Sequence, residues 1–244
     1  MRRWAWIPVL AGLVLAWEAW VQLRDVPDYL LPAPSAIAQA LWDERSTLAS
    51  QALVTLREML LGFAAAVAAG LAAAVVMQRL PWLRTALYPL LVGSQSVPVV
   101  AIAPLLVIYL GFGLAPKVLI VALVCFFPVT ANALDGFASA PAELRSTMRT
   151  LNASERATFW RIELPWAAPR IFTGARIAAS YAAVAALFSE YAGGSGGLAE
   201  SMRNGLDTPL VGAAITLLAL MSMGLFALVT LAERLALPWS RRRR

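Results

Sequence analysis

Long runs of apolar residues, several close to or above 20 residues in length, dominate this chain of 244 residues. A helix needs about 20 residues to cross roughly 30 Å of hydrocarbon, so such runs are typical of membrane spans. Hydrophobic residues make up 60% of the chain, a share that a soluble domain rarely reaches. A transmembrane barrel would show strict alternation over about 10 residues at a time, which this sequence lacks. The predicted fold class is therefore an all-α, polytopic membrane protein.

Six transmembrane helices are predicted, joined without a long linker or a convincing internal repeat, so one domain accounts for residues 1–244. The first span resembles a signal peptide. Trp17, Glu18 and Trp20, however, stand where a cleavage site would need small residues, so this span is expected to be retained. The predicted spans cover residues 4–23, 54–77, 87–110, 118–134, 171–188 and 210–235.

Basic residues predict the orientation of the chain. With the N-terminus in the cytoplasm, 14 of the 20 basic residues fall in cytoplasmic segments, while Arg24, Arg45, Lys117 and Arg203 fall on the opposite side. This asymmetry follows the positive-inside rule and places both termini in the cytoplasm. The same distribution explains the net charge of +6 by topology, and no nucleic-acid partner is expected. The cytoplasmic set is Arg2, Arg3, Arg79, Arg84, Arg145, Arg149, Arg156, Arg161, Arg170, Arg234 and Arg241 to Arg244.

Two predicted spans carry a small residue at every fourth position. These rows let helix backbones approach closely in lipid, either between helices of one chain or between subunits. The rows are Gly62, Ala66, Gly70 and Ala74 in one span, and Gly174, Ala178, Ala182 and Ala186 in another.

Missing residue types exclude several chemistries. The chain has no histidine, which rules out a Ser-His-Asp triad and a histidine metal site. Residues 193–197 match G-x-S-x-G formally but lack its strand context, so a flexible loop is expected. Lys117, the only lysine, follows no phosphate-binding glycine pattern. The single cysteine, Cys125, has no partner for an intramolecular disulfide.

The polar stretch at residues 143–165, ELRSTMRTLNASERATFWRIELP, interrupts the apolar runs. Leu144, Met148 and Leu151 share one face of a first short helix. Asn152 suits a left-handed helix stop, and Ser154 suits the N-cap of a second short helix. Pro165 is expected to end that second helix. The stretch is thus predicted to form two amphipathic helices at the cytoplasmic surface, which either rest on lipid headgroups or dock to a protein partner through residues such as Phe159 and Trp160.

This stretch resembles the cytoplasmic loop of bacterial ABC importer permeases, whose pattern is E-A-A, three residues, G, nine residues, I-x-L-P. Ile162-Glu163-Leu164-Pro165 matches the end, Asn152 stands at the glycine, and residues 146–148 stand at E-A-A. Residues 31–44 resemble the nitrate/sulfonate/taurine group. Residues 94–113 and 121–137 look closer to the branch that imports thiamine's pyrimidine precursor, the resemblance covering most of residues 30–235.

The resemblance implies a permease subunit in the bacterial inner membrane. Two copies would form the path, an ATPase subunit would bind ATP and Mg²⁺ and grip residues 142–165, and a binding protein would deliver the cargo from outside. The chain itself would need no cofactor. The cargo would be a pyrimidine-like heterocycle, or alternatively nitrate, a sulfonate, taurine or riboflavin. The residues implied to couple the ATPase are Glu143, Arg145, Ser146, Thr147, Met148, Asn152, Ala153, Ser154, Phe159, Trp160, Ile162, Leu164 and Pro165.

Polar residues within spans are costly, so they are candidates for a translocation path. Each could equally form an interhelical hydrogen bond or anchor the chain at the interface. A neutral path favours an uncharged heterocycle over an anion, although Arg57 and Arg176 leave that choice open. The path candidates are Ser94, Gln95, Ser96, Asn132, Glu190 and Tyr191.

Two other classes of protein compete with a permease. A membrane-embedded enzyme would need acidic or cysteine chemistry, for which Glu18 and Glu58 are the spare span residues. A scaffold would need residues 143–165 for partner binding but not for transport. Copurification of an ATPase subunit separates the permease from the enzyme.

Overall fold

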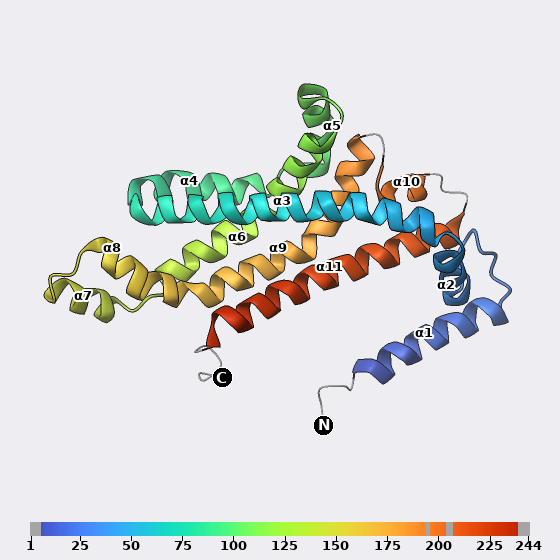
Figure 1. Cartoon of the computed structure of the whole chain (residues 1–244), viewed down its shortest axis with the longest axis horizontal. Helices are drawn as coiled ribbons and strands as arrows, with labels where there is room; N and C mark the ends of the chain where they lie inside the picture. Colours follow the sequence, from blue (N-terminus) through green and yellow to red (C-terminus); the bar gives the residue numbers. More distant parts are fainter. Residues whose placement is uncertain (1–5, 194–195, 204–206, 239–244) are drawn as a thin grey trace.

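The computed structural model of the chain describes residues 6–193, 196–203 and 207–238. It is almost entirely helical, and long helices lie side by side in an elongated bundle (Figure 1). The elements are α1 (Trp6–Leu23), α2 (Pro34–Asp43), α3 (Arg45–Arg79), α4 (Pro81–Ser94), α5 (Val99–Leu110), α6 (Leu114–Ala138), α7 (Ala142–Thr150), α8 (Glu155–Thr158), a π-helix η2 (Phe159–Glu163), α9 (Leu164–Gly193), α10 (Leu198–Arg203) and α11 (Thr208–Ala236).

Four helical stretches of the described chain are long and apolar enough to cross a membrane: Arg45–Arg79, Leu114–Ala138, Glu155–Gly193 and Thr208–Ala236. Each contains one predicted span, and α1 contains the described part of the first. α3 has 35 residues and is about 52 Å long, so it extends beyond a bilayer core of roughly 30 Å. The all-α membrane architecture predicted from the sequence is confirmed.

The predicted third span is wrong as a single helix. It is divided into α4 and α5, which are joined by residues 95–98, and α5 turns away from the line of α4 (Figure 1). Pro98 stands at the N-cap of α5 and has no N–H to continue a helical ladder. The residues before Pro98 form a hydrogen-bonded turn, in which Ser96 N donates to Gly93 O at 3.0 Å.

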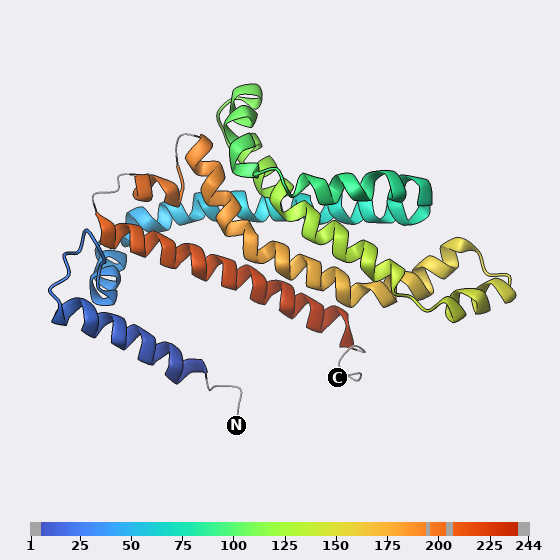
Figure 2. The same cartoon turned by 180° about the vertical axis from the view of Figure 1, so that it is seen from behind.

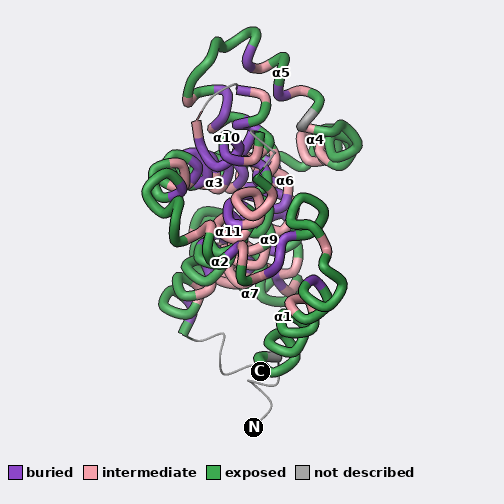
Figure 3. Tube along the Cα trace, turned by 90° about the vertical axis from the view of Figure 1, so that its right-hand side faces the viewer, coloured by how far each residue is buried: buried purple, intermediate pink, exposed green. Residues whose placement is uncertain are grey.

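Small residues bring α3 and α9 against the two sides of α6, and this contact forms the core of the bundle. A Cβ atom added to Gly70 would lie 2.9 Å from Thr130 Oγ1, and one added to Gly174 would lie 2.6 Å from Pro128 O. Both rows of small residues are buried, and burial concentrates along these helices (Figure 3). Packing within one chain, the first of the two interpretations, accounts for both rows.

Segments that the sequence assigned to opposite sides of a membrane lie toward opposite ends of the bundle. The last residues of α3 and α11 lie at the same end as α7 and α8, while α2 and α10 lie at the other (Figure 1). From behind, α7 and α8 are seen to project beyond the rest of the bundle at their end (Figure 2). The predictions for Arg2, Arg3, Gly194, Ser195 and Arg241 to Arg244 lie outside the described residues.

We predict that Gly174→Ala lowers the melting temperature of the detergent-purified protein. The new methyl group must displace the Pro128 carbonyl or Asn132, and overpacking of this kind typically costs about 1–3 kcal/mol. Gly224→Ala is the matched control, because a Cβ atom at Gly224 in α11 meets nothing within 4 Å. Equal melting temperatures for the two variants would contradict close packing of α6 and α9.

Candidate functional site

The polar stretch folds into two helical pieces that meet at a tight, hydrogen-bonded turn. Asn152 has φ +52°, the left-handed conformation predicted for it. Ala153 N donates to Met148 O and Asn152 N donates to Arg149 O, both at 2.9 Å, which satisfies two of the last carbonyl groups of α7. The Ser154 hydroxyl then accepts from Ala157 N at 3.2 Å and caps α8. The predicted break at Asn152 and the cap at Ser154 are confirmed.

The predicted end of the second helix at Pro165 is wrong, because helical structure continues without a break from Glu155 to Gly193. The π-helical turn η2 explains this result. Leu164 N donates to Phe159 O, five residues back rather than four. This wider turn shifts the hydrogen-bond ladder just before Pro165, whose missing N–H would otherwise leave a gap. α8, η2 and the span α9 therefore form one continuous helical segment, which changes direction between α8 and α9 (Figure 1).

Phe159 holds the start of this helical segment against the bundle. Its side chain is buried and lies 5.5 Å from the Phe137 ring, between ring centroids. The Arg79 guanidinium, from the last residue of α3, lies 4.7 Å from the centre of the Phe159 ring. Cation–π contact of this kind adds about 0.5–1 kcal/mol at exposed sites and more when desolvated. Phe159 thus ties α3, α6 and η2 together, and its role as an anchor differs from the partner contact that the sequence suggested.

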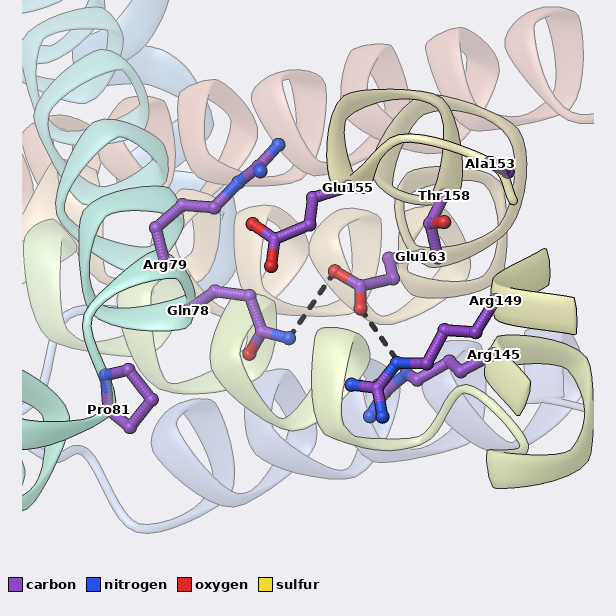
Figure 4. Close-up of a pocket in the computed structure, with 9 residues that line it drawn as sticks. All are labelled: Gln78, Arg79, Pro81, Arg145, Arg149, Ala153, Glu155, Thr158 and Glu163. Atoms are coloured by element: carbon purple, nitrogen blue, oxygen red, sulfur yellow. Dashed lines mark hydrogen bonds and ion pairs between the residues drawn. The ribbon is translucent and has the colours of Figure 1, made fainter.

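Arg145 fixes α7 against the same end of the bundle. Its Nη2 donates to Phe137 O at 2.6 Å, and its Nε lies 3.3 Å from Glu163 Oε1. Gln78 Nε2 donates to the other Glu163 oxygen at 3.4 Å (Figure 4). Sequence reasoning did not single out Glu163 or Gln78, because only the fold brings residues 78, 145 and 163 together.

The outer surface of the segment carries exposed apolar side chains. Leu151 is 71% exposed and Trp160 is 58% exposed, although both are large and hydrophobic. Met148 is only half-buried, and it shares this part of the segment with Leu144. Helices α7 and α8, residues 142–158, form a projecting arm (Figure 2). An exposed apolar surface on and beside such an arm is typical of a docking site for a protein groove. Of the other predicted coupling residues, four are exposed, namely Glu143, Ser146, Thr147 and Ser154. Four more are partly buried: Ala153, Ile162, Leu164 and Pro165.

A second feature is a cavity of about 330 Å³ where α4 and α5 meet α6 and α9. Gln95 lines it at the helix break, and Tyr181 and Phe188 line it from α9. Tyr181, Val184 and Phe188 follow one another at helical spacing, a signal that sequence reasoning could have used and did not. Among the described residues that line this cavity, none carries a charged side chain.

The other path candidates lie outside the lining of this cavity. Ser94 Oγ donates to Leu91 O at 2.7 Å, and Asn132 Nδ2 donates to Pro128 O at 2.8 Å, so both bond within their own helices. Ser96 and Tyr191 are exposed. Arg176 pairs with Glu233 of α11, which gives this span arginine a structural partner.

Glu190 lies in a buried polar cluster at the other end of the bundle from α7. Its Oε1 accepts from Thr55 Oγ1, and its Oε2 accepts from Ala199 N at 2.8 Å. Next to it, Lys117 Nζ lies 2.9 Å from Glu58 Oε1, and both side chains are less than 10% exposed. The cluster joins α3, α6, α9 and α10. Glu18 is similarly occupied, since it accepts from Ser35 N and Oγ at 2.9 and 2.7 Å.

These features define a class: an α-helical membrane protein with several long apolar helices, a projecting arm at one end and a polar break inside one predicted span. The chain belongs to the family of binding-protein-dependent transport system inner membrane components, whose model matches residues 65–242. It is therefore an importer permease subunit of the ABC type.

Relatives that cover nearly the whole chain support this assignment. The riboflavin transport system permease protein RibX of Chloroflexus aurantiacus is 34% identical over 98% of this chain and 93% of its own length. The formylaminopyrimidine transport permease protein ThiX of Halalkalibacterium halodurans is 33% identical, over 94% and 93%. The taurine transport system permease protein TauC of Escherichia coli is 30% identical, over 97% and 93%.

We predict that Lys117→Met strongly destabilises the protein, because it leaves the buried Glu58 without its cation. Loss of one partner from a buried ion pair typically costs about 3–5 kcal/mol. The double variant Lys117→Met/Glu58→Met removes both charges and is expected to recover most of the loss. Thermal unfolding in detergent measures both effects, and a double variant no more stable than the single one would show that the pair is not the cause.

Proposed function

We propose that this permease imports a small, uncharged, pyrimidine-like heterocycle, such as a thiamine precursor. Two copies form the path, a partner ATPase binds the segment at residues 142–165, and an extracytoplasmic binding protein delivers the cargo. The partner ATPase binds ATP and Mg²⁺, since the only lysine of this chain is held in a buried ion pair rather than in a phosphate-binding loop. Both termini and the α7–α8 arm face the cytoplasm.

The unbroken helix from Glu155 to Gly193 carries the mechanical part of this proposal. Thr158, near the start of this continuous helix, and Tyr181, at the cavity, are separated by 23 positions, or about 35 Å along the helix. A displacement of the arm by a closing ATPase therefore moves the cavity wall directly, without passing through a loop. A short rigid element held by a moving partner can bias a bundle between two arrangements.

The chemistry of the cavity supports an uncharged aromatic cargo. Gln95 offers an amide that can both donate and accept, while Tyr181 and Phe188 offer aromatic faces. A sulfonate or nitrate would call for a basic group, and Arg176 is already paired with Glu233. ThiX and RibX carry names of aromatic nitrogen heterocycles, in agreement with this choice. Taurine or a sulfonate, as in the name of TauC, is the alternative.

We predict that Gly-Ser replacement of residues 146–152 leaves membrane insertion intact and abolishes uptake in proteoliposomes containing the ATPase and the binding protein. The replacement removes Leu151 and the turn at Asn152, so the ATPase loses its grip. Asn152→Gly is the control that keeps the left-handed turn, and it should retain uptake. Uptake by the Gly-Ser variant would contradict the coupling role. Lost ATPase binding combined with normal uptake would favour a scaffold.

We predict that Gln95→Ala lowers uptake of the heterocycle about 10-fold, the effect of one lost hydrogen bond in a cavity. ATPase copurification should not change, because Gln95 lies on the cavity and not on the arm. Thr230→Ala, which removes a hydroxyl bonded within α11, is the control. Transport of taurine or sulfonates in place of the heterocycle would overturn the proposed cargo but leave the coupling proposal standing.

A further inference from the structure

A cavity of about 370 Å³ lies behind the α7–α8 arm, between the arm and the junction of α3 with α4. Its lining comes from three separate segments: Gln78, Arg79 and Pro81 at the α3–α4 junction, Arg145 and Arg149 of α7, and Ala153, Glu155, Thr158 and Glu163 of the turn, α8 and η2 (Figure 4). A volume of this size is at the lower end of the range for small-ligand sites. None of the roles proposed above uses this space.

The charges around the cavity do not balance. Arg145 and Glu163 neutralise each other, and Gln78 donates to the second Glu163 oxygen. The rest of the charged lining is Arg79, Arg149 and Glu155, and the Glu155 carboxylate lies between the two arginines in the close-up (Figure 4). Within the described chain, no carboxylate oxygen lies within 4.0 Å of the side-chain nitrogens of these two arginines. Arg79 stacks its face on Phe159, which leaves the N–H groups at its edge able to donate. The cavity therefore favours an anion.

The position of the cavity along α3 places it at the level of lipid headgroups. The apolar run of α3 ends at Met77, and Gln78 and Arg79 are the first polar residues after it. Trp82, one residue after Pro81 in the lining, is 68% exposed, as expected of an aromatic residue at a membrane interface. Leu80 beside it is also exposed. A phosphate in this cavity can thus belong to a lipid whose chains lie along α3 and α4.

We propose that this cavity binds the phosphate of an anionic phospholipid headgroup, with Arg79 and Arg149 as its charge partners. A zwitterionic lipid brings its own cation toward the same arginines, so the site selects lipids such as phosphatidylglycerol over phosphatidylcholine. A bound headgroup offsets the excess of positive charge between the end of α3 and α7. The shared chemistry is that of a phosphate group, and the lipid is the source to which we commit.

The test titrates short-chain phosphatidylglycerol or phosphatidylcholine into the detergent-purified full chain and measures bound lipid by native mass spectrometry. Arg79→Gln and Arg149→Gln should each weaken phosphatidylglycerol binding about 5-fold, the contribution expected of one basic residue near a membrane surface. Arg149→Lys should retain most of the binding. Arg156→Gln is the matched control, because Arg156 is an exposed arginine of α8 outside the lining and should not change binding.

Several results would overturn the proposal. Equal binding of phosphatidylcholine, or an equal loss in Arg156→Gln, would show nonspecific adsorption to a basic surface. Displacement of phosphatidylglycerol by millimolar inorganic phosphate would identify a free phosphate, and not a lipid, as the ligand. A melting temperature is measured for each variant, and Arg149→Lys keeps the test decisive if a Gln variant unfolds. The result does not depend on transport, so it stands or falls separately from the proposed function.

Discussion

Close contact of α6 with α3 on one side and with α9 on the other is the constraint on which the rest of the structure depends. Lipid tails are as apolar as the helices, so burial of hydrophobic surface drives helix association in a membrane only weakly. Association relies on van der Waals contact, which needs short distances between backbones. Gly62, Gly70 and Gly174 provide them, because any side chain there would meet atoms of α6. The arm, the central cavity and the buried cluster are all built on these helices.

The features that sequence reasoning predicted correctly are local ones. Hydropathy located four long apolar helices, the four-residue spacing of small residues located the packing faces, and residue type located the turn at Asn152 and the cap at Ser154. Each depends on residues within a few positions of one another. The division of the third span was only hinted at by Pro98, and its prediction as one helix was wrong.

The features that it missed depend on residues far apart in the chain or on an irregular turn. Lys117 meets Glu58 across 59 positions, and Glu190 meets Thr55 across 135, so no local pattern announces the buried cluster. Pro165 is an ordinary signal for the end of a helix, and only the π-helical turn before it allows the helix to continue. The predicted coupling residues likewise fall into two groups, because Phe159 and Arg145 face the bundle while Trp160 faces outward.

The π-helical turn has a further consequence for the direction in which the arm points. A π turn accommodates one residue more than an α turn, and each residue of an α-helix rotates the chain by about 100°. The number of residues in η2 therefore sets the direction of α7 and α8, which precede Phe159, relative to α9. Loss of a single residue there would rotate the outward face of Leu151 about the helix axis while leaving the sequence of α7 and α8 untouched. Related chains could thus bind partners at different positions through a change in the number of residues in this turn alone.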